Sequence, residues 1–131
     1  MRSRILNIEI AVKPDAVYSA VRDPAKLPLW ASGIAKSVEV RDGIWFVETG
    51  TALGTVQLTF CADNPFGVLD HTVRLPDGTE VLNPVRVIAN GEGSELIFTV
   101  FQTAGMSDEQ FVNDVQAVKR DLKTIKHLLE S

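Results

Sequence analysis

The chain has 131 residues, of which 45% are hydrophobic and 23% charged, as is typical of a soluble globular protein that folds as one domain, residues 1–131. Its net charge of −4 argues against a nucleic-acid-binding protein, because binding to phosphates requires a basic surface patch. Cys61 is the only cysteine, which excludes an internal disulfide and a cysteine-rich metal site.

The N-terminal part of the chain predicts a strand followed by two short helices. Mostly apolar residues share one face over residues 4–12, and this period of two indicates a strand and not a signal peptide. Pro14 begins a helix that carries two valines four residues apart on its buried side and ends at the Asp-Pro pair of residues 23–24. A second helical piece over residues 27–33 stops at a glycine.

The middle of the chain predicts an antiparallel meander. Clusters of Gly, Asn and Asp recur at intervals of about ten residues, and these residue types tolerate the positive φ angles of tight hairpins. The clusters are "RDG" at 41–43, "GTALG" at 50–54, "NPFG" at 64–67, "PDG" at 76–78 and "NGEG" at 90–93. Six strands fall between residues 35 and 103, and the first strand makes seven.

The last part of the chain predicts a long amphipathic helix. Ser107, followed three residues later by Gln110, forms a capping box that begins the helix. Apolar residues then recur at steps of three and four over residues 111–129 and form one continuous stripe. Because a β-rich chain precedes this helix, we expect it to pack on its own sheet and not to form a coiled coil.

Nothing in the sequence indicates a membrane segment, a metal or a cofactor. No run of about 18 apolar residues occurs, so we expect a cytoplasmic protein without membrane insertion. The two histidines, His71 and His127, lie far apart and show no ligand spacing, so we expect neither a metal site nor a cofactor. The expected oligomeric state is a monomer or a homodimer.

His71 directly follows Asp70, and such a pair invites a catalytic interpretation. Successive residues of a strand point to opposite faces, so we expect the two side chains to lie on opposite sides of the sheet and not to touch. His71 then shares its face with apolar neighbours, where it is either an ordinary core histidine or a polar anchor in an apolar cavity.

Arg86 interrupts an apolar strand in which neither face is polar, so the alternation does not decide where it points. It either pairs with Asp70 or Glu48 across neighbouring strands or enters a cavity to hold a ligand carboxylate or enolate. Pro84, two residues earlier, predicts an edge position or a bulge. Four aromatic residues are candidates either for a pocket or for an ordinary core: Trp30, Trp45, Phe60 and Phe98.

The order of a strand, a broken helical segment, a meander and a long C-terminal helix, with "VKPDAVYSAVRDPAKLPLWASGI" after the first strand, resembles the START/Bet v 1-like (SRPBCC) superfamily. Within it the chain is most similar to bacterial polyketide cyclase/dehydrase-like proteins. The resemblance implies an α+β helix-grip fold, in which a seven-stranded curved antiparallel sheet surrounds the long C-terminal helix and leaves a hydrophobic cavity. The polar groups expected in that cavity are His71, Asn83 and Arg86.

Three functions follow as expectations. The first is a protein that binds a small hydrophobic or aromatic molecule through Trp30, Trp45, Phe60, His71, Asn83, Arg86 and Phe98. The second is a cyclase, dehydratase or isomerase acting on a polyketide-like substrate, in which His71 is the catalytic acid or base and Arg86 stabilises an enolate. The third is a protein-interaction domain whose cavity is filled by its own side chains.

Overall fold

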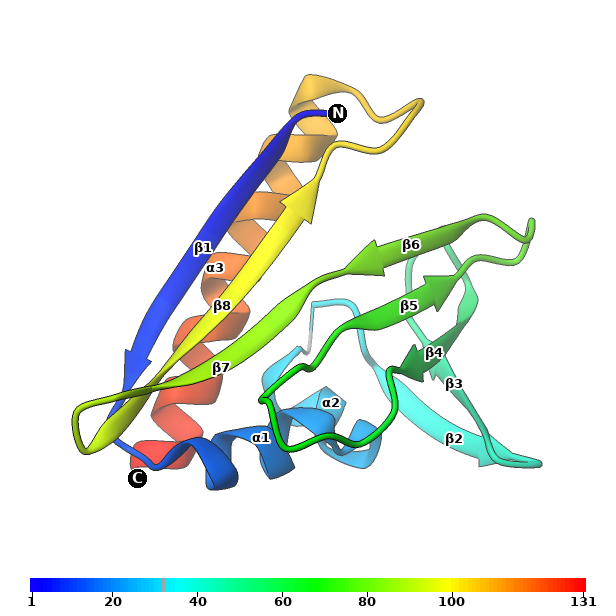
Figure 1. Cartoon of the computed structure of the whole chain (residues 1–131). Coiled ribbons are helices and arrows are strands. Elements are labelled where there is room, and N and C mark those ends of the chain that lie inside the picture. Colours follow the sequence, from blue (N-terminus) through cyan, green and yellow to red (C-terminus); the bar gives the residue numbers. More distant parts are fainter. Residues whose placement is uncertain (32) are drawn as a thin grey trace.

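The computed structural model describes residues 1–31 and 33–131 and confirms the α+β class (Figure 1). In chain order the elements are β1 (Ser3–Ile10), α1 (Pro14–Arg22), the 3-10 turn η1 (Pro24–Lys26), α2 (Leu27–Trp30), β2 (Ser37–Arg41), β3 (Ile44–Glu48), β4 (Thr55–Phe60), β5 (His71–Arg74), β6 (Glu80–Asn83), β7 (Val85–Asn90), β8 (Gly93–Phe101) and α3 (Asp108–Glu130). The helical piece predicted over residues 27–33 corresponds to α2, which ends at Trp30, before the predicted stop at Gly33; the turn η1 precedes it, and Ser32 lies outside the described residues.

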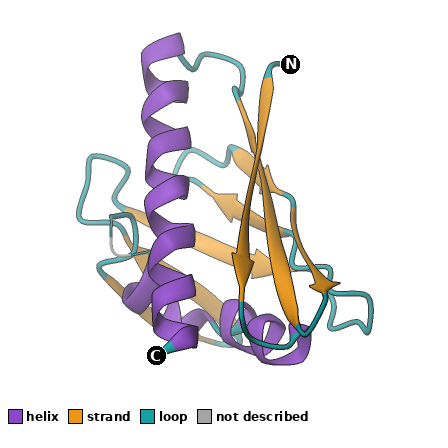
Figure 2. Ribbon diagram, turned by 90° about the vertical axis from the view of Figure 1, so that its left-hand side faces the viewer, coloured by secondary structure: helices purple, strands orange, loops and turns teal. Residues whose placement is uncertain are grey.

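All strand pairs are antiparallel, and they form two hydrogen-bonded sheets. The small sheet has the order β1-β8-β7, and the large sheet has the order β2-β3-β4-β5-β6. Helix α3 runs along one face of the small sheet (Figure 1), and the large sheet lies behind the helix when the molecule is viewed from the helix side (Figure 2). The helix therefore has one side toward each sheet.

The number of strands differs from the prediction, since the structure has eight where the sequence predicts seven. The stretch around Pro84 forms two strands, because proline has no N–H to continue the ladder with β5. The carboxylate of Asp70 accepts a hydrogen bond from the backbone N–H of Val85 (2.9 Å), and a bridge between Val68 and Arg86 continues the same register beyond the break. β6 and β7 thus form one bent strand that passes from the large sheet into the small one and produces the predicted curvature.

The buried side chains fall into two clusters. The first joins the small sheet to α1 and α3 through residues that include Ile10, Val17, Leu96, Phe111 and Ile125, each at most 2% exposed. The second lies between α2 and strands β3 and β4. Trp30 packs against both clusters.

The helix that closes the chain forms as predicted. Ser107 Oγ accepts a hydrogen bond from the Gln110 backbone (3.1 Å), and the Gln110 side chain accepts one from the Ser107 backbone (2.9 Å), which completes the capping box. The apolar stripe of α3 is buried against the small sheet. α3 thereby holds the small sheet on one side and leaves another side available to the large sheet.

Candidate functional site

His71 begins β5 and lies on the inner face of the large sheet, the face whose apolar side chains pack against α2. Its cross-strand neighbours are Phe60 on β4 and Asn83 on β6. The centroid of its ring lies 5.0 Å from that of Phe60 and 6.1 Å from that of Phe98, which belongs to the small sheet. His71 therefore connects the inner faces of the two sheets at the point where they diverge.

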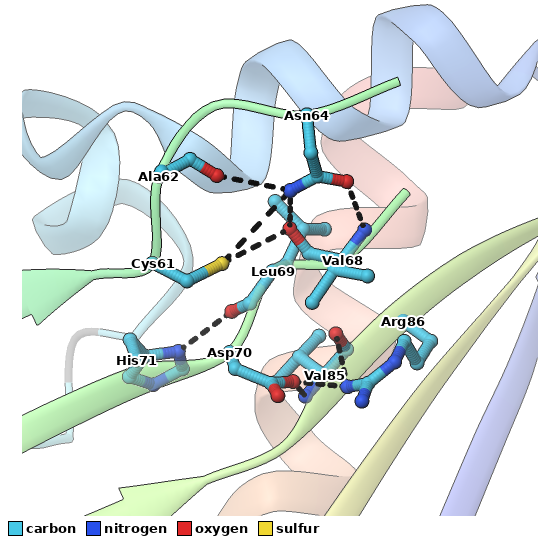
Figure 3. Close-up of polar contacts among 9 residues, drawn as sticks. All are labelled: Cys61, Ala62, Asn64, Val68, Leu69, Asp70, His71, Val85 and Arg86. Atoms are coloured by element: carbon cyan, nitrogen blue, oxygen red, sulfur yellow. Dashed lines mark hydrogen bonds and ion pairs between the residues drawn. The ribbon is translucent and has the colours of Figure 1, made fainter. Parts of the chain in front are cut away.

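The predicted separation of His71 from Asp70 is confirmed, and Figure 3 shows the two side chains pointing in different directions. The Nδ1 atom of His71 lies 3.1 Å from the carbonyl oxygen of Leu69. A carbonyl oxygen only accepts, so Nδ1 carries the proton and Nε2 is left as an acceptor. Burial lowers the pKa of His71, so its imidazole is neutral at pH 7. Among the described residues, none forms a hydrogen bond with Nε2.

Arg86 pairs with Asp70, which is one of the two alternatives that the sequence left open (Figure 3). Its neighbours Val85 and Val87 are buried in the core, and strand alternation turns Arg86 to the opposite, outer face. Arg86 therefore does not belong with the interior candidates, because its guanidinium is held outside by a carboxylate.

The other sequence-predicted residues lie around His71. Trp45 and Phe98 are half-buried, as are Phe60 and Asn83, although all four occupy inner faces of the sheets. Trp30 approaches from α2, and its indole Nε1 is buried without a hydrogen-bond partner among the described residues. The structure thus brings the aromatic candidates to one region and leaves their rings incompletely covered.

Two of the depressions on the surface of the described residues lie away from the inner face of the sheets. One, of about 440 Å³, is on the outer face of the large sheet beside Phe46 and Arg74. The other, of about 430 Å³, lies between Tyr18, Arg22 and Asp63. The cavity between sheet and helix therefore remains a prediction.

The loop that leads into β5 is hydrogen-bonded to the side chain of Asn64. Its Nδ2 donates to the carbonyl oxygens of Ala62 (3.0 Å) and Val68 (2.9 Å), and its Oδ1 accepts from the backbone N–H of Val68 (3.1 Å), as Figure 3 shows. The Cys61 thiol also donates to Val68 (3.4 Å). This network fixes the approach of the chain to Leu69 and so the orientation of the His71 ring.

Arg22 lies between this region and the surface depression beside Tyr18 and Asp63, and the sequence analysis missed it. The guanidinium carbon of Arg22 lies 5.9 Å from the ring centroid of Phe60 and 5.8 Å from that of Tyr18. Its Nη1 is buried and has no hydrogen-bond partner among the described residues. The sequence shows only a basic residue at the end of a helix, and tertiary packing decides which rings it meets.

Asp121 is a second residue that the sequence analysis missed. It lies about 140° around α3 from Lys126, at 100° per residue, and Lys126 donates to the backbone of Glu9 on β1. Asp121 therefore faces away from β1, and burial raises its pKa to about 6. No ion pair to it occurs among the described residues. In the sequence, the only indication that Asp121 is partly buried was its position on one flank of the apolar stripe of α3.

Within the described residues no group of three or more His, Cys, Asp or Glu side chains could hold a metal ion. None of the described helices combines the length and the apolar character needed to cross a membrane.

No protein-family model matches the chain, and no curated protein matches it either. Several solved structures do match the chain. Ara h 8.0201 is 20% identical with a TM-score of 0.74, over 98% of this chain and 97% of that one. The Aha1 dimer from Colwellia psychrerythraea is 15% identical with a TM-score of 0.73, over 99% of this chain and 97% of that one. DynU16, from the dynemicin biosynthetic locus, is 15% identical with a TM-score of 0.73, over 98% of this chain but 47% of DynU16.

Identities of this size establish the fold and not the function. They confirm the fold that the resemblance implied, and the pairing of a curved antiparallel sheet with a long C-terminal helix agrees with it. The chain has the Bet v 1-like helix-grip fold.

Proposed function

We propose that the protein binds a small hydrophobic or aromatic molecule between the large sheet and α3. The observation that carries this proposal is the row formed by Phe60, His71 and Phe98, whose rings lie 5.0 and 6.1 Å apart across the two sheets. The three side chains are only half-buried although they line inner faces. An apolar surface with a few oriented polar groups is the usual composition of a ligand pocket.

His71 would fix the orientation of the ligand. Its Nδ1 proton is engaged by Leu69 at 3.1 Å, so the ring is held in one tautomer with Nε2 as the acceptor. Asn83 lies next to it on the same face and adds an amide group. A ligand hydroxyl or N–H would be recognised at this point, while its apolar part contacts the aromatic rings.

A fluorescence titration with N-phenyl-1-naphthylamine, a neutral dye that brightens in apolar surroundings, tests the proposal. We expect saturable binding to the wild-type protein. Val73→Trp, on the inner face of β5, should weaken binding about tenfold by filling the space. Thr72→Trp adds the same ring on the outer face of the same strand and should leave the affinity unchanged. Absence of saturable binding, or equal affinity in all three proteins, would refute the proposal and favour an interaction domain with a filled interior.

A second candidate function is a cyclase, dehydratase or isomerase with His71 as general base. The specific observation in its favour is the lowered pKa of His71, which leaves the imidazole neutral at pH 7 with Nε2 unengaged. His71→Leu separates the two functions. If the protein only binds, a ligand that donates a hydrogen bond should bind about fivefold more weakly to this variant. An enzyme would instead retain dye binding and lose turnover of a polyketide-like substrate.

A further inference from the structure

The cation of Arg22 lacks a full complement of partners. The nearest carboxylate oxygen belongs to Asp63, 3.8 Å from Arg22 Nε, and the Asp63 side chain is 81% exposed. That oxygen already accepts a hydrogen bond of 2.7 Å from the hydroxyl of Tyr18. An exposed carboxylate at this distance contributes little to neutralising a guanidinium. The aromatic rings of Tyr18 and Phe60 stabilise the cation from the side but accept no strong hydrogen bond.

The buried polar side-chain atoms without partners in the described part of the chain are both donors. They are Nη1 of Arg22 and Nε1 of Trp30. Both residues come from the segment between the start of α1 and the end of α2, and the ring of Phe60 that Arg22 approaches is the one that contacts His71. A buried donor without an acceptor costs free energy, so a bound acceptor would relieve that cost.

We propose that the ligand of this site is an aromatic acid, whose anionic oxygen group is held by the Nη1 side of Arg22. The proposal rests on the proposed function, since it assigns the chemical class of the molecule bound there. The aromatic part would contact Phe60 and His71, and the planar guanidinium would meet the carboxylate. Arg22 would then hold the ligand carboxylate, a role that the sequence suggested for Arg86. Arg86 is instead paired with Asp70.

Two dyes of nearly the same shape test this inference. 1-Anilinonaphthalene-8-sulfonate is N-phenyl-1-naphthylamine with an added sulfonate, so the pair isolates the contribution of the anionic group. Arg22→Gln should weaken binding of the sulfonate dye about tenfold or more and leave the affinity for the neutral dye within about twofold. Arg22→Lys keeps the charge but not the planar fork, and should fall between the wild type and Arg22→Gln.

Arg74→Gln is the matched control, because it removes the same charge from the outer face of the large sheet, beside the depression at Phe46. This variant should bind both dyes like the wild type. If it weakens the sulfonate dye as much as Arg22→Gln does, the anion binds outside and the inference is wrong.

The possible outcomes distinguish a failure of this inference from a failure of the proposed function. Unchanged binding of both dyes to Arg22→Gln, or equal weakening of both, would overturn the role of Arg22 and leave the proposed function standing. Failure of the neutral dye to bind even the wild-type protein would overturn the proposed function, and the inference with it. A near-ultraviolet circular dichroism spectrum like that of the wild type shows that Arg22→Gln folds, because partly unfolded states lose this signal and also bind such dyes.

Discussion

The two halves of the molecule are both built on antiparallel strands, but they differ in how completely their interior side chains are buried. The small sheet, α1 and α3 enclose a core in which Ile10, Leu96, Phe111 and Ile125 are at most 2% exposed. The inner face of the large sheet carries larger aromatic residues, yet Trp45 and Phe60 remain half-buried there. The interior of the first half is closely covered, whereas the aromatic rings on the inner face of the second half are only half-buried.

The polar groups follow the same division. In the small-sheet half, the buried Ser94 donates to the backbone of Val12. Where α1 and α2 meet the large sheet, Arg22 Nη1 and Trp30 Nε1 lack partners among the described residues, and His71 presents a free acceptor. A fold tolerates unsatisfied groups where they serve recognition, provided another region supplies the stability. Under the proposed function, the small sheet would supply the stability and the large sheet the recognition.

Removing one phenylalanine ring from each half is the most direct test of this comparison. Phe111→Ala deletes a ring that is 1% exposed and lies under the Arg2 guanidinium, and should lower the free energy of unfolding by about 3–5 kcal/mol. Phe60→Ala removes a half-buried ring and should cost less than half as much. Urea denaturation of both variants measures the difference, and equal losses would mean that the two halves are packed alike.

The small-sheet half was also the more predictable one. The period-two alternation of β1, the capping box at Ser107 and the stripe of α3 are local patterns, and the structure confirms each of them. The strand count was wrong at Pro84 because the sequence does not tell whether a proline only bends a strand or divides it between two sheets. That outcome depends on which partner strands lie on either side.

The candidate site was predictable only in part. Alternation alone separated His71 from Asp70, since it needs no tertiary information. It could not decide the direction of Arg86, because both faces of that strand are apolar and the decisive partner, Asp70, lies on another strand. Arg22 was missed for the same reason, since the rings that surround it are brought together only by folding.

The junction between the halves gives the second prediction. Gly67 has a φ of +72°, and a Cβ there would collide with the carbonyl oxygen of Val87, the residue whose N–H donates to Gly67 (3.0 Å). Gly67→Ala should therefore cost about 2–4 kcal/mol, from the backbone conformation together with the clash. Gly91→Ala is the control, because φ is +59° and nothing lies within 4 Å, so only about 1–2 kcal/mol should be lost. Similar losses in the two variants would show that the loop before β5 shifts freely at the junction.

The smallest expected effect concerns Asp121, and it tests how far water is excluded from the flank of α3 that faces away from β1. Asp121 has its pKa raised from 3.8 to about 6 by burial. Between about pH 4 and pH 6 the folded state retains a proton that the unfolded state has lost, so the free energy of unfolding falls as the pH rises through this window. Asp121→Asn cannot ionise, and should be more stable than the wild type by about 1–2 kcal/mol at pH 7 and equally stable below pH 4.

Urea denaturation at pH 4, 5, 6 and 7 checks this expectation. Asp114→Asn provides the graded comparison, because burial also raises the pKa of Asp114, whose side chain is more exposed and should give a smaller gain. If Asp121→Asn follows the pH dependence of the wild type, Asp121 is fully hydrated in the folded state. The flank of α3 away from β1 would then be open to bulk water. In that case the difference in burial between the small-sheet half and the large-sheet half would not extend to α3.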